Sequence, residues 1–324
     1  MAGPSYEEME RARRRGAAVL TLEDDSYPAL LRASSDPPPI LYLRGRLAPE
    51  DVLAIAIVGS RRATPHGIDV ARRLASGLAA AGFTVVSGLA RGIDAASHRG
   101  ALESGGRTLA FLGSGLDRIY PAEHLKLAEE IAGRGAVLSE FSFGTPPYRS
   151  HFPARNRAIA WIAWATIVVE AARDSGSLIT AKLAADEGRA VYAVPGPVGE
   201  PNAEGTNGLL RAGALICRGA GDVIEDLAPQ IAEAAARIAA LRGPGRGDGI
   251  AGPPGGATPP GAAGPQTPEE RRVLELLPRT RGIGIETLGE VSGIAPGPLQ
   301  AVLLELELKG LARQLPGRRF TSSG

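Results

Sequence analysis

Cysteine and histidine are scarce in this chain of 324 residues, and their scarcity excludes several kinds of site. The one cysteine, Cys217, lies in an apolar run and has no partner for a disulfide within the chain, so we expect a buried structural thiol. The four histidines show no metal-ligand spacing, and the chain contains no Ser/His/Asp order and no GxSxG motif. We therefore predict no metal site, no cofactor and no catalytic residue.

Net charge and long apolar runs are lacking as well. The net charge is only +1, so a surface for nucleic acid has to be local rather than spread over the molecule. No signal peptide and no membrane-spanning run is visible, which favours a cytoplasmic protein. An apolar content of 44% is enough for a core, and the length suggests two or three domains.

The motifs of common nucleotide sites are also missing. No GxxxxGK[ST] sequence occurs, and Gly59 is followed by Ser-Arg-Arg, with no second glycine where a dinucleotide fingerprint has one. The next apolar run, 83–86, ends in Ser-Gly and lacks the acidic residue that binds a ribose. A phosphate bound by this chain is expected to belong neither to NAD nor to a Walker-type nucleotide.

Strand, turn and helix patterns alternate from residue 51 onward. They predict an α/β fold with a parallel or mostly parallel sheet and helices on both faces. Ligands of such sheets bind at the carboxyl ends of the strands. The predicted strands are 52–58, 83–87, 108–112, 136–139, 166–170, 190–194 and 214–217.

Composition divides the chain into four parts. Residues 1–48 form a short N-terminal extension, and residues 49–242 form the core with the alternating pattern. A linker, 243–266, contains 9 Gly and 6 Pro in 24 positions. The tail, 267–324, regains a globular pattern and predicts a small winged-helix domain.

The elements of the two end segments follow from local patterns. In the tail, the helix at 298–309 would be the recognition helix of a DNA reader. It offers Glu305, Glu307 and only one base, Lys309, so we favour a protein-interaction or accessory role over base readout. The other predicted elements are helices at 5–15, 268–277 and 285–291, and strands at 40–43, 311–315 and 319–321.

The segment 55–67, IAIVGSRRATPHG, predicts a buried strand, a Gly-Ser turn and a helix that begins near Thr64 or Pro65. Glycine lets a backbone approach closely, and a helix N-terminus offers unpaired N–H groups, so the arrangement suits an anion. Arg61 and Arg62 follow the turn directly and add positive charge. The alternative is a turn that serves only the packing of strand and helix.

Other strand ends carry comparable features. We expect Ser175–Ser177 to begin a helix whose N-terminus forms a second binding site for an anion. Glu170 ends the preceding strand, and we favour a structural role for its carboxylate over a catalytic one. His98 falls in a predicted helix, 93–103, and is expected to pack or to form a hydrogen bond.

The segment 141–157, FSFGTPPYRSHFPARNR, concentrates aromatic and arginine side chains and contains no acid. In proteins that bind single-stranded nucleic acid, bases stack on such rings while arginines contact the phosphates. The alternative is that the phenylalanines fill the core at a strand–helix junction. The residues concerned are Phe141, Phe143, Tyr148, Phe152, Arg149, Arg155 and Arg157.

Six motifs between residues 40 and 227, taken together and in this order, resemble the DNA-processing protein A family (DprA/Smf). The motifs are Ile57-Val-Gly-Ser-Arg61, Ser87-Gly-Leu-Ala-Arg-Gly-Ile-Asp94 with Ala96-Ser97-His98, Gly113-Ser-Gly-Leu-Asp117 with Tyr120-Pro121, Phe152-Pro-Ala-Arg-Asn-Arg157, Ser175-Gly-Ser-Leu-Ile-Thr-Ala181 and Val191-Tyr-Ala-Val-Pro-Gly196.

The resemblance implies an extended Rossmann-like core that binds single-stranded DNA in a basic pocket and is not known as an enzyme. It also implies a homodimer that protects incoming single strands in natural transformation and helps to load the recombinase RecA. On the matching positions, the Gly-Ser-Arg turn would contact a phosphate, and Arg149 and Phe152 would contact the backbone and a base. The full set of predicted DNA-binding residues is Gly59, Ser60, Arg61, Arg62, Arg91, Arg149, Phe152, Arg155, Arg157, Ser175, Gly176 and Ser177.

The N-terminal end departs from the family's pattern. Many members carry a helical module of about 60 residues or more before the element that matches Tyr27-Pro-Ala-Leu-Leu31, whereas only 26 residues precede it here. We expect either a truncated module or a start that was chosen downstream.

Two other functions fit parts of the sequence. A phosphoribohydrolase that acts on a nucleoside monophosphate would use the same phosphate turns together with Glu170, although the chain lacks a Gly-Gly-x-Gly-Thr loop. An adaptor whose winged helix binds a protein would retain the phosphate turns only as relics.

Overall fold

The computed structural model describes residues 6–228 and, in the tail, 268–278, 283–294, 299, 302–303, 306, 311–315 and 319–322. The chain divides into two compact units, Met1–Gly245 and Arg246–Gly324. The predicted linker, 243–266, lies outside the described residues.

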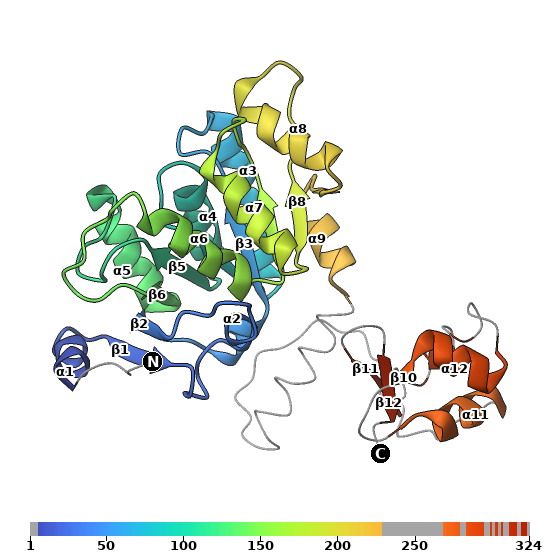
Figure 1. Cartoon of the computed structure of the whole chain (residues 1–324). Coiled ribbons are helices and arrows are strands. Elements are labelled where there is room, and N and C mark those ends of the chain that lie inside the picture. The colour runs from blue at the N-terminus through green and yellow to red at the C-terminus, as the bar shows by residue number, and fades with distance from the viewer. Residues whose placement is uncertain are drawn as a thin grey trace. The chain divides into compact units, whose positions relative to one another are not determined.

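The first unit is built on a sheet of nine strands in the order β1-β2-β6-β5-β4-β3-β7-β8-β9 (Figure 1). The strands from β3 to β9 are parallel, while β1 and β2 are antiparallel additions at one edge. The strands are β1 Ala18–Thr21, β2 Ile40–Gly45, β3 Ala54–Val58, β4 Thr84–Ser87, β5 Thr108–Leu112, β6 Ala136–Ser139, β7 Ala165–Val168, β8 Ala190–Ala193 and β9 Leu215–Ile216.

The predicted mostly parallel α/β fold is confirmed, and all seven predicted core strands are present at or within a few residues of their expected positions. The strand predicted at 40–43 is present as β2. The sequence patterns did not predict strand β1. It has only four residues, and only Leu20 among them is buried, so its local pattern is weak.

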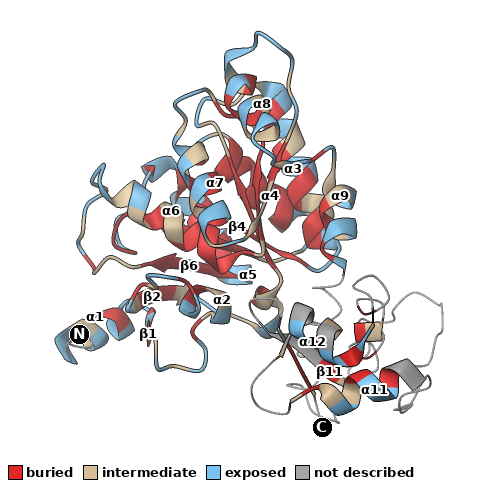
Figure 2. Ribbon diagram, turned by 45° about the vertical axis from the view of Figure 1, so that its right-hand side comes forward, coloured by how far each residue is buried: buried red, intermediate tan, exposed pale blue. Residues whose placement is uncertain are grey.

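Helices cover both faces of this sheet, whose central strands are buried throughout (Figure 2). Along β3, Ala56 and Val58 pack with Ile159 on one face, whereas Ile55 and Ile57 pack with α3 and α4 on the other. The helices are α1 Tyr6–Arg14, α2 Ala29–Arg32, α3 Pro65–Ala80, α4 Ile93–Glu103, α5 Leu125–Arg134, α6 His151–Ile162, α7 Gly176–Asp186, α8 Glu204–Arg211 and α9 Ala220–Asp226, with short 3-10 turns η1 Pro49–Val52, η2 Ala122–His124 and η3 Pro201–Ala203.

The N-terminal segment, which the sequence sets apart as residues 1–48, continues the sheet of the core. Strand β2 pairs with β6 over Tyr42–Gly45, and β1 pairs with β2. An ion pair strengthens the junction, because Arg157 of α6 contacts both Asp36 and Glu140. The extension is therefore part of the same compact unit as the sheet.

The second unit is a small winged-helix domain. Helices α11 Pro268–Leu276 and α12 Ile285–Ser292 accompany a three-stranded sheet, and its core contains Val273, Leu288 and Phe320. Most of the predicted helix at 298–309 lies outside the described residues, although Leu299, Leu303 and Leu306 are buried in this core. The strands are β10 Ile283–Gly284, β11 Ala312–Leu315 and β12 Arg319–Ser322.

Within the described part of the chain, none of the helices has both the length and the apolar character that crossing a membrane requires.

Replacing Arg157 should destabilise the first unit. Arg157→Ala leaves the carboxylate of Glu140, whose side chain is only 12% exposed, without its partner, and we expect the free energy of unfolding to fall by about 1–3 kcal/mol. Urea denaturation measures this loss. Arg99→Ala, which removes an exposed arginine without an ion pair among the described residues, should stay near wild type. Unchanged stability of Arg157→Ala would contradict the structural role of this arginine.

Candidate nucleic-acid interface

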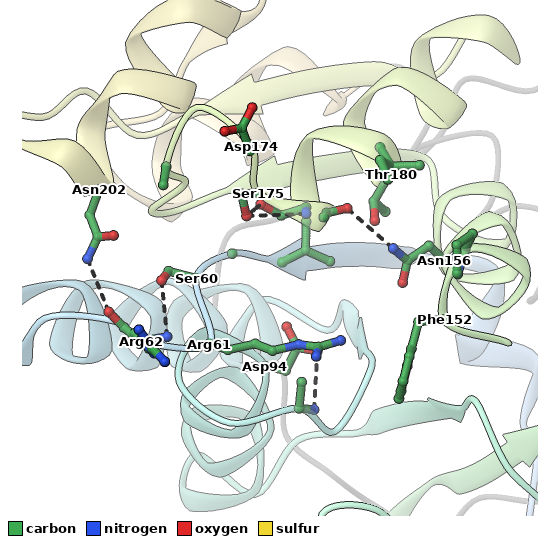
Figure 3. A pocket seen from close by; sticks show the side chains of 18 of the residues that line it. Ser60, Arg61, Arg62, Asp94, Phe152, Asn156, Asp174, Ser175, Thr180 and Asn202 are labelled. Carbon is green, nitrogen blue, oxygen red and sulfur yellow. Dashed lines mark hydrogen bonds between the residues drawn. The ribbon is translucent and has the colours of Figure 1, made fainter. Parts of the chain in front are cut away.

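The loops after β3, β4 and β7 meet the start of α6 around a cavity of about 910 Å³ at the carboxyl edge of the sheet. In Figure 3, Asp174, Ser175 and Thr180 line one side of this cavity, and Arg61, Arg62 and Asp94 lie opposite. A smaller cavity of about 190 Å³ adjoins it and shares Arg61, Arg62, Ala90, Phe152 and Arg155 with it.

Two glycines allow the loops after β3 and β4 to touch backbone to backbone. Gly92 has a φ of +73°, and a Cβ there would overlap the carbonyl oxygen of Ser60. A Cβ on Gly59 would lie 2.6 Å from Cγ1 of Ile93. The amide of Ile93 donates a hydrogen bond of 3.2 Å to the carbonyl of Ser60, so the two loops form one rigid wall.

Four arginines line the large cavity without an ion pair among the described residues. Arg61, Arg62 and Arg149 belong to the predicted set, whereas Arg173 does not. In the sequence, Arg173 lies between the predicted strand end at Glu170 and the Ser-Gly-Ser turn. This position alone would have placed it at the carboxyl edge of the sheet, beside the predicted anion site. Unpaired guanidinium groups around one opening favour an anionic ligand with several charges.

Phe152 forms part of the cavity wall between two guanidinium groups. The Cζ atom of Arg61 lies 4.9 Å from the centre of its ring and that of Arg155 lies 5.9 Å away. Phe152 is only half-buried, and the exposed ring of Tyr120 lies 6.0 Å from it. The core-filling alternative applies instead to Phe143, which is buried against Tyr42.

Arg155 lies beneath the cavity and is paired with a buried carboxylate. Its side chain is 4% exposed, and Nη1 lies 3.8 Å from Oδ2 of Asp94, whose side chain is 9% exposed. Burial raises the pKa of Asp94, while the charge of Arg155 opposes the shift. A Cβ on Gly88 would overlap the guanidinium, so this glycine makes room for it. The ion pair with Asp94 neutralises the charge of Arg155, so we assign this side chain a structural role beneath the cavity.

The structure gives two other predicted arginines carboxylate partners. Arg91 lines the smaller cavity, but its Nε and Nη2 atoms each lie 2.6 Å from the carboxylate of Glu123. Arg157 does not line either cavity. It contacts Asp36 and Glu140 and lies over the ring of Trp161, so the expectation that it lines the pocket is wrong.

Glu170 has a structural role at the start of α3. Its carboxylate accepts hydrogen bonds from the backbone N–H and the hydroxyl of Thr64, at 2.9 and 2.5 Å, and Thr64 caps α3 by accepting from the amide of Gly67. The helix begins at Pro65 as predicted. The carboxylate occupies the place that the sequence pattern assigns to an external anion at this helix N-terminus.

The second predicted anion site opens into the large cavity. Ser175 caps α7, and its hydroxyl accepts a hydrogen bond of 3.4 Å from the amide of Ser177. Gly176 is exposed at the first position of the helix, and all three residues of Ser175–Ser177 line the cavity. Gly59 and Ser60 line its other side. Taken over both cavities, eleven of the twelve predicted residues border one of them, and the exception is Arg157.

The remaining titratable candidates are structural. His98 is buried, its Nδ1 lies 2.7 Å from the hydroxyl of Thr108, and burial lowers its pKa to about 3. Cys217 is also buried, as expected, and burial raises the pKa of its thiol to about 12. Among the described residues, no group of three or more His, Cys, Asp or Glu side chains could hold a metal ion.

Known proteins match both units of the chain. The family model of the DNA recombination-mediator protein A matches residues 18–228, and that of the DprA winged helix domain matches residues 257–318. Protein Smf from Synechocystis sp. is 35% identical over 97% of this chain and 82% of its own length.

Two solved structures are similar to this chain. The X-ray structure of DNA processing protein A (DprA) from Streptococcus pneumoniae matches with a TM-score of 0.64 and 37% identity, over 68% of this chain and 75% of that one. A structure of DNA processing protein A from Helicobacter pylori, described as giving insight into a single-stranded DNA binding mode, matches with a TM-score of 0.59 and 33% identity, over 65% of this chain and 96% of that one.

Glu170→Gln should cost stability. The amide group of glutamine cannot accept both hydrogen bonds from Thr64, so we expect the free energy of unfolding to fall by about 1–2 kcal/mol. Urea denaturation measures the change, with the exposed Glu130→Gln of α5 as the matched control. Wild-type stability of Glu170→Gln would show that the cap contributes nothing and would reopen a catalytic role for this carboxylate.

Proposed function

The chain belongs to the DNA recombination-mediator protein A family, and on this premise we propose that its sheet-edge cavity binds single-stranded DNA. One observation carries the proposal. The half-buried ring of Phe152 lies in the same cavity as four arginines without ion pairs among the described residues.

The chemistry of the cavity suits a single strand better than a duplex. An aromatic ring stacks on a base only when the base is not already paired and stacked in a double helix, and stacking of this kind tolerates any sequence. The guanidinium of Arg61 lies 4.9 Å from the centre of the Phe152 ring, so a base that stacks on this face replaces the contact, and the released guanidinium can meet a phosphate of the same nucleotide chain. The cap of α7 at Ser175–Ser177 supplies polar groups on the opposite wall.

We further propose the role that family membership suggests. The protein would protect single strands that enter the cell during natural transformation and would help to load the recombinase RecA onto them, as a homodimer in the cytoplasm. The description of the family as recombination mediators supports this role, and so does the single-stranded DNA binding described for the Helicobacter pylori relative.

Binding without catalysis fits the cavity better than the phosphoribohydrolase alternative. The carboxylate that this alternative assigns to catalysis, Glu170, is held by Thr64, and the buried Asp94 is paired with Arg155. Incubation with AMP followed by chromatography of the released base separates the two functions, and we expect no release of adenine.

The proposal is tested by fluorescence anisotropy of a labelled oligo-dT at two salt concentrations, with duplex DNA as competitor. If about four phosphates are neutralised, the log–log slope is about −2.8, and affinity falls roughly 50-fold between about 50 and 200 mM salt. Arg61→Ala should weaken binding roughly tenfold for all sequences and reduce the slope by about 0.7. Arg99→Ala removes one positive charge on α4 and serves as the control. Absence of binding at low salt would overturn the proposal.

Removing the partner of Arg91 should strengthen binding. A phosphate that uses Arg91 has to displace the carboxylate of Glu123, so Glu123→Gln is expected to bind oligo-dT about two- to fivefold more tightly. Titration by anisotropy at low salt measures the gain, and Glu129→Gln on α5 controls for the change in net charge. Equal gains for both variants would show that only the overall charge matters and that Arg91 lies outside the DNA path.

A further inference from the structure

We propose that the exposed ring of Tyr148, backed by His151 and Phe141, is a second base-stacking platform that receives the nucleotide next to the one at Phe152. The inference rests on the proposed binding of single-stranded DNA and extends it to a part of the surface that lies beside the cavity. Its ligand is an unpaired nucleobase of the same strand.

Three aromatic rings form a cluster at this position. The rings of Phe141 and His151 lie parallel, with centroids 4.0 Å apart and planes 15° apart. Tyr148 meets His151 edge to face, with centroids 5.2 Å apart and planes at 84°. Phe141 and His151 are half-buried, whereas Tyr148 is 56% exposed. The cluster therefore has a half-buried side, formed by Phe141 and His151, and a solvent-exposed side, formed by Tyr148.

Backbone hydrogen bonds hold the segment that carries Tyr148 in place. The amide of Tyr148 donates a hydrogen bond of 2.9 Å to the carbonyl of Pro146, and the amide of His151 donates one of 3.0 Å to the carbonyl of Tyr148. The side chain of Tyr148 makes no hydrogen bond among the described residues. A large apolar ring that is exposed but oriented in advance loses little conformational entropy when it binds a flat partner.

The platform is continuous with the proposed DNA site. Arg149 follows Tyr148 directly, is exposed, and lines the large cavity without an ion pair among the described residues. His151 is followed directly by Phe152, which forms part of the wall of both cavities. A strand whose phosphate contacts Arg149 therefore has one base available to Phe152 and the next available to Tyr148.

The surroundings favour a nucleic acid as the occupant. The segment 141–157 contains no acidic residue, so nothing within it repels a phosphate chain. A ring that served only the core would be buried as Phe143 is, at 7% exposed. Stacking of bases on an exposed ring beside an unpaired arginine is the usual way in which proteins bind single strands without regard to sequence.

The test compares Tyr148→Ala with Tyr148→Phe on oligo-dT and on a single nucleotide. On an oligonucleotide of about twelve residues, Tyr148→Ala should lose affinity on the order of five- to a hundredfold, while Tyr148→Phe keeps it because the ring remains. On the mononucleotide dTMP, which can occupy only the place at Phe152, the loss should be small. The salt slope should stay unchanged because no phosphate contact is removed. Tyr6→Ala, which removes an exposed tyrosine on α1, is the matched control.

Failure of the platform and failure of the proposed function give different results. If the wild-type protein does not bind oligo-dT, the proposed function is wrong. If the wild type binds, Phe152→Ala weakens binding of both ligands and Tyr148→Ala binds as the wild type does, then only the platform is wrong. Photo-crosslinking of the wild-type protein to an oligonucleotide with 5-iodouracil gives a second measurement that needs no variant. A crosslink at Tyr148 supports the platform, and crosslinks confined to the cavity overturn it.

Discussion

The buried pair of Arg155 and Asp94 is the contact on which the arrangement of the site depends. Asp94 lies in the first turn of α4 and Arg155 lies in the second turn of α6, so their ion pair joins the loop after β4 to the helix that carries Phe152 and follows the segment with Tyr148. Both charges are removed from water, a state that is tolerated only with a close partner. Gly88 leaves the space for the guanidinium, which explains why a residue without a side chain stands there.

The arginines of the site divide into two groups according to their partners. Arg155 and Arg157 are paired with carboxylates from distant parts of the chain and hold elements together. Arg61, Arg62, Arg149 and Arg173 are exposed, line the cavity and have no ion pair among the described residues. Only the second group can exchange water and counterions for phosphates without breaking a bond within the protein.

Acidic residues at the cavity would limit the strength of the proposed binding. Asp174 and Glu204 line the large cavity, and Glu123 holds Arg91 beside the smaller one. Stacking of a base on the half-buried ring of Phe152 would add attraction that salt does not screen. The stacking part and the charge part of the affinity therefore depend on different residues.

The sequence by itself determined most of the elements and the turns, because these depend on local patterns. The succession of hydrophobic runs, the cap at Thr64, the start of α3 at Pro65 and the cap at Ser175 follow from neighbours within a few residues. The convergence of the loops on one edge also followed, because parallel strands end on the same side of a sheet. Only the tertiary structure decided which charged groups are free. Asp36 is 121 positions from Arg157, and Thr64 is 106 positions from Glu170, so no local pattern shows that these groups are already occupied.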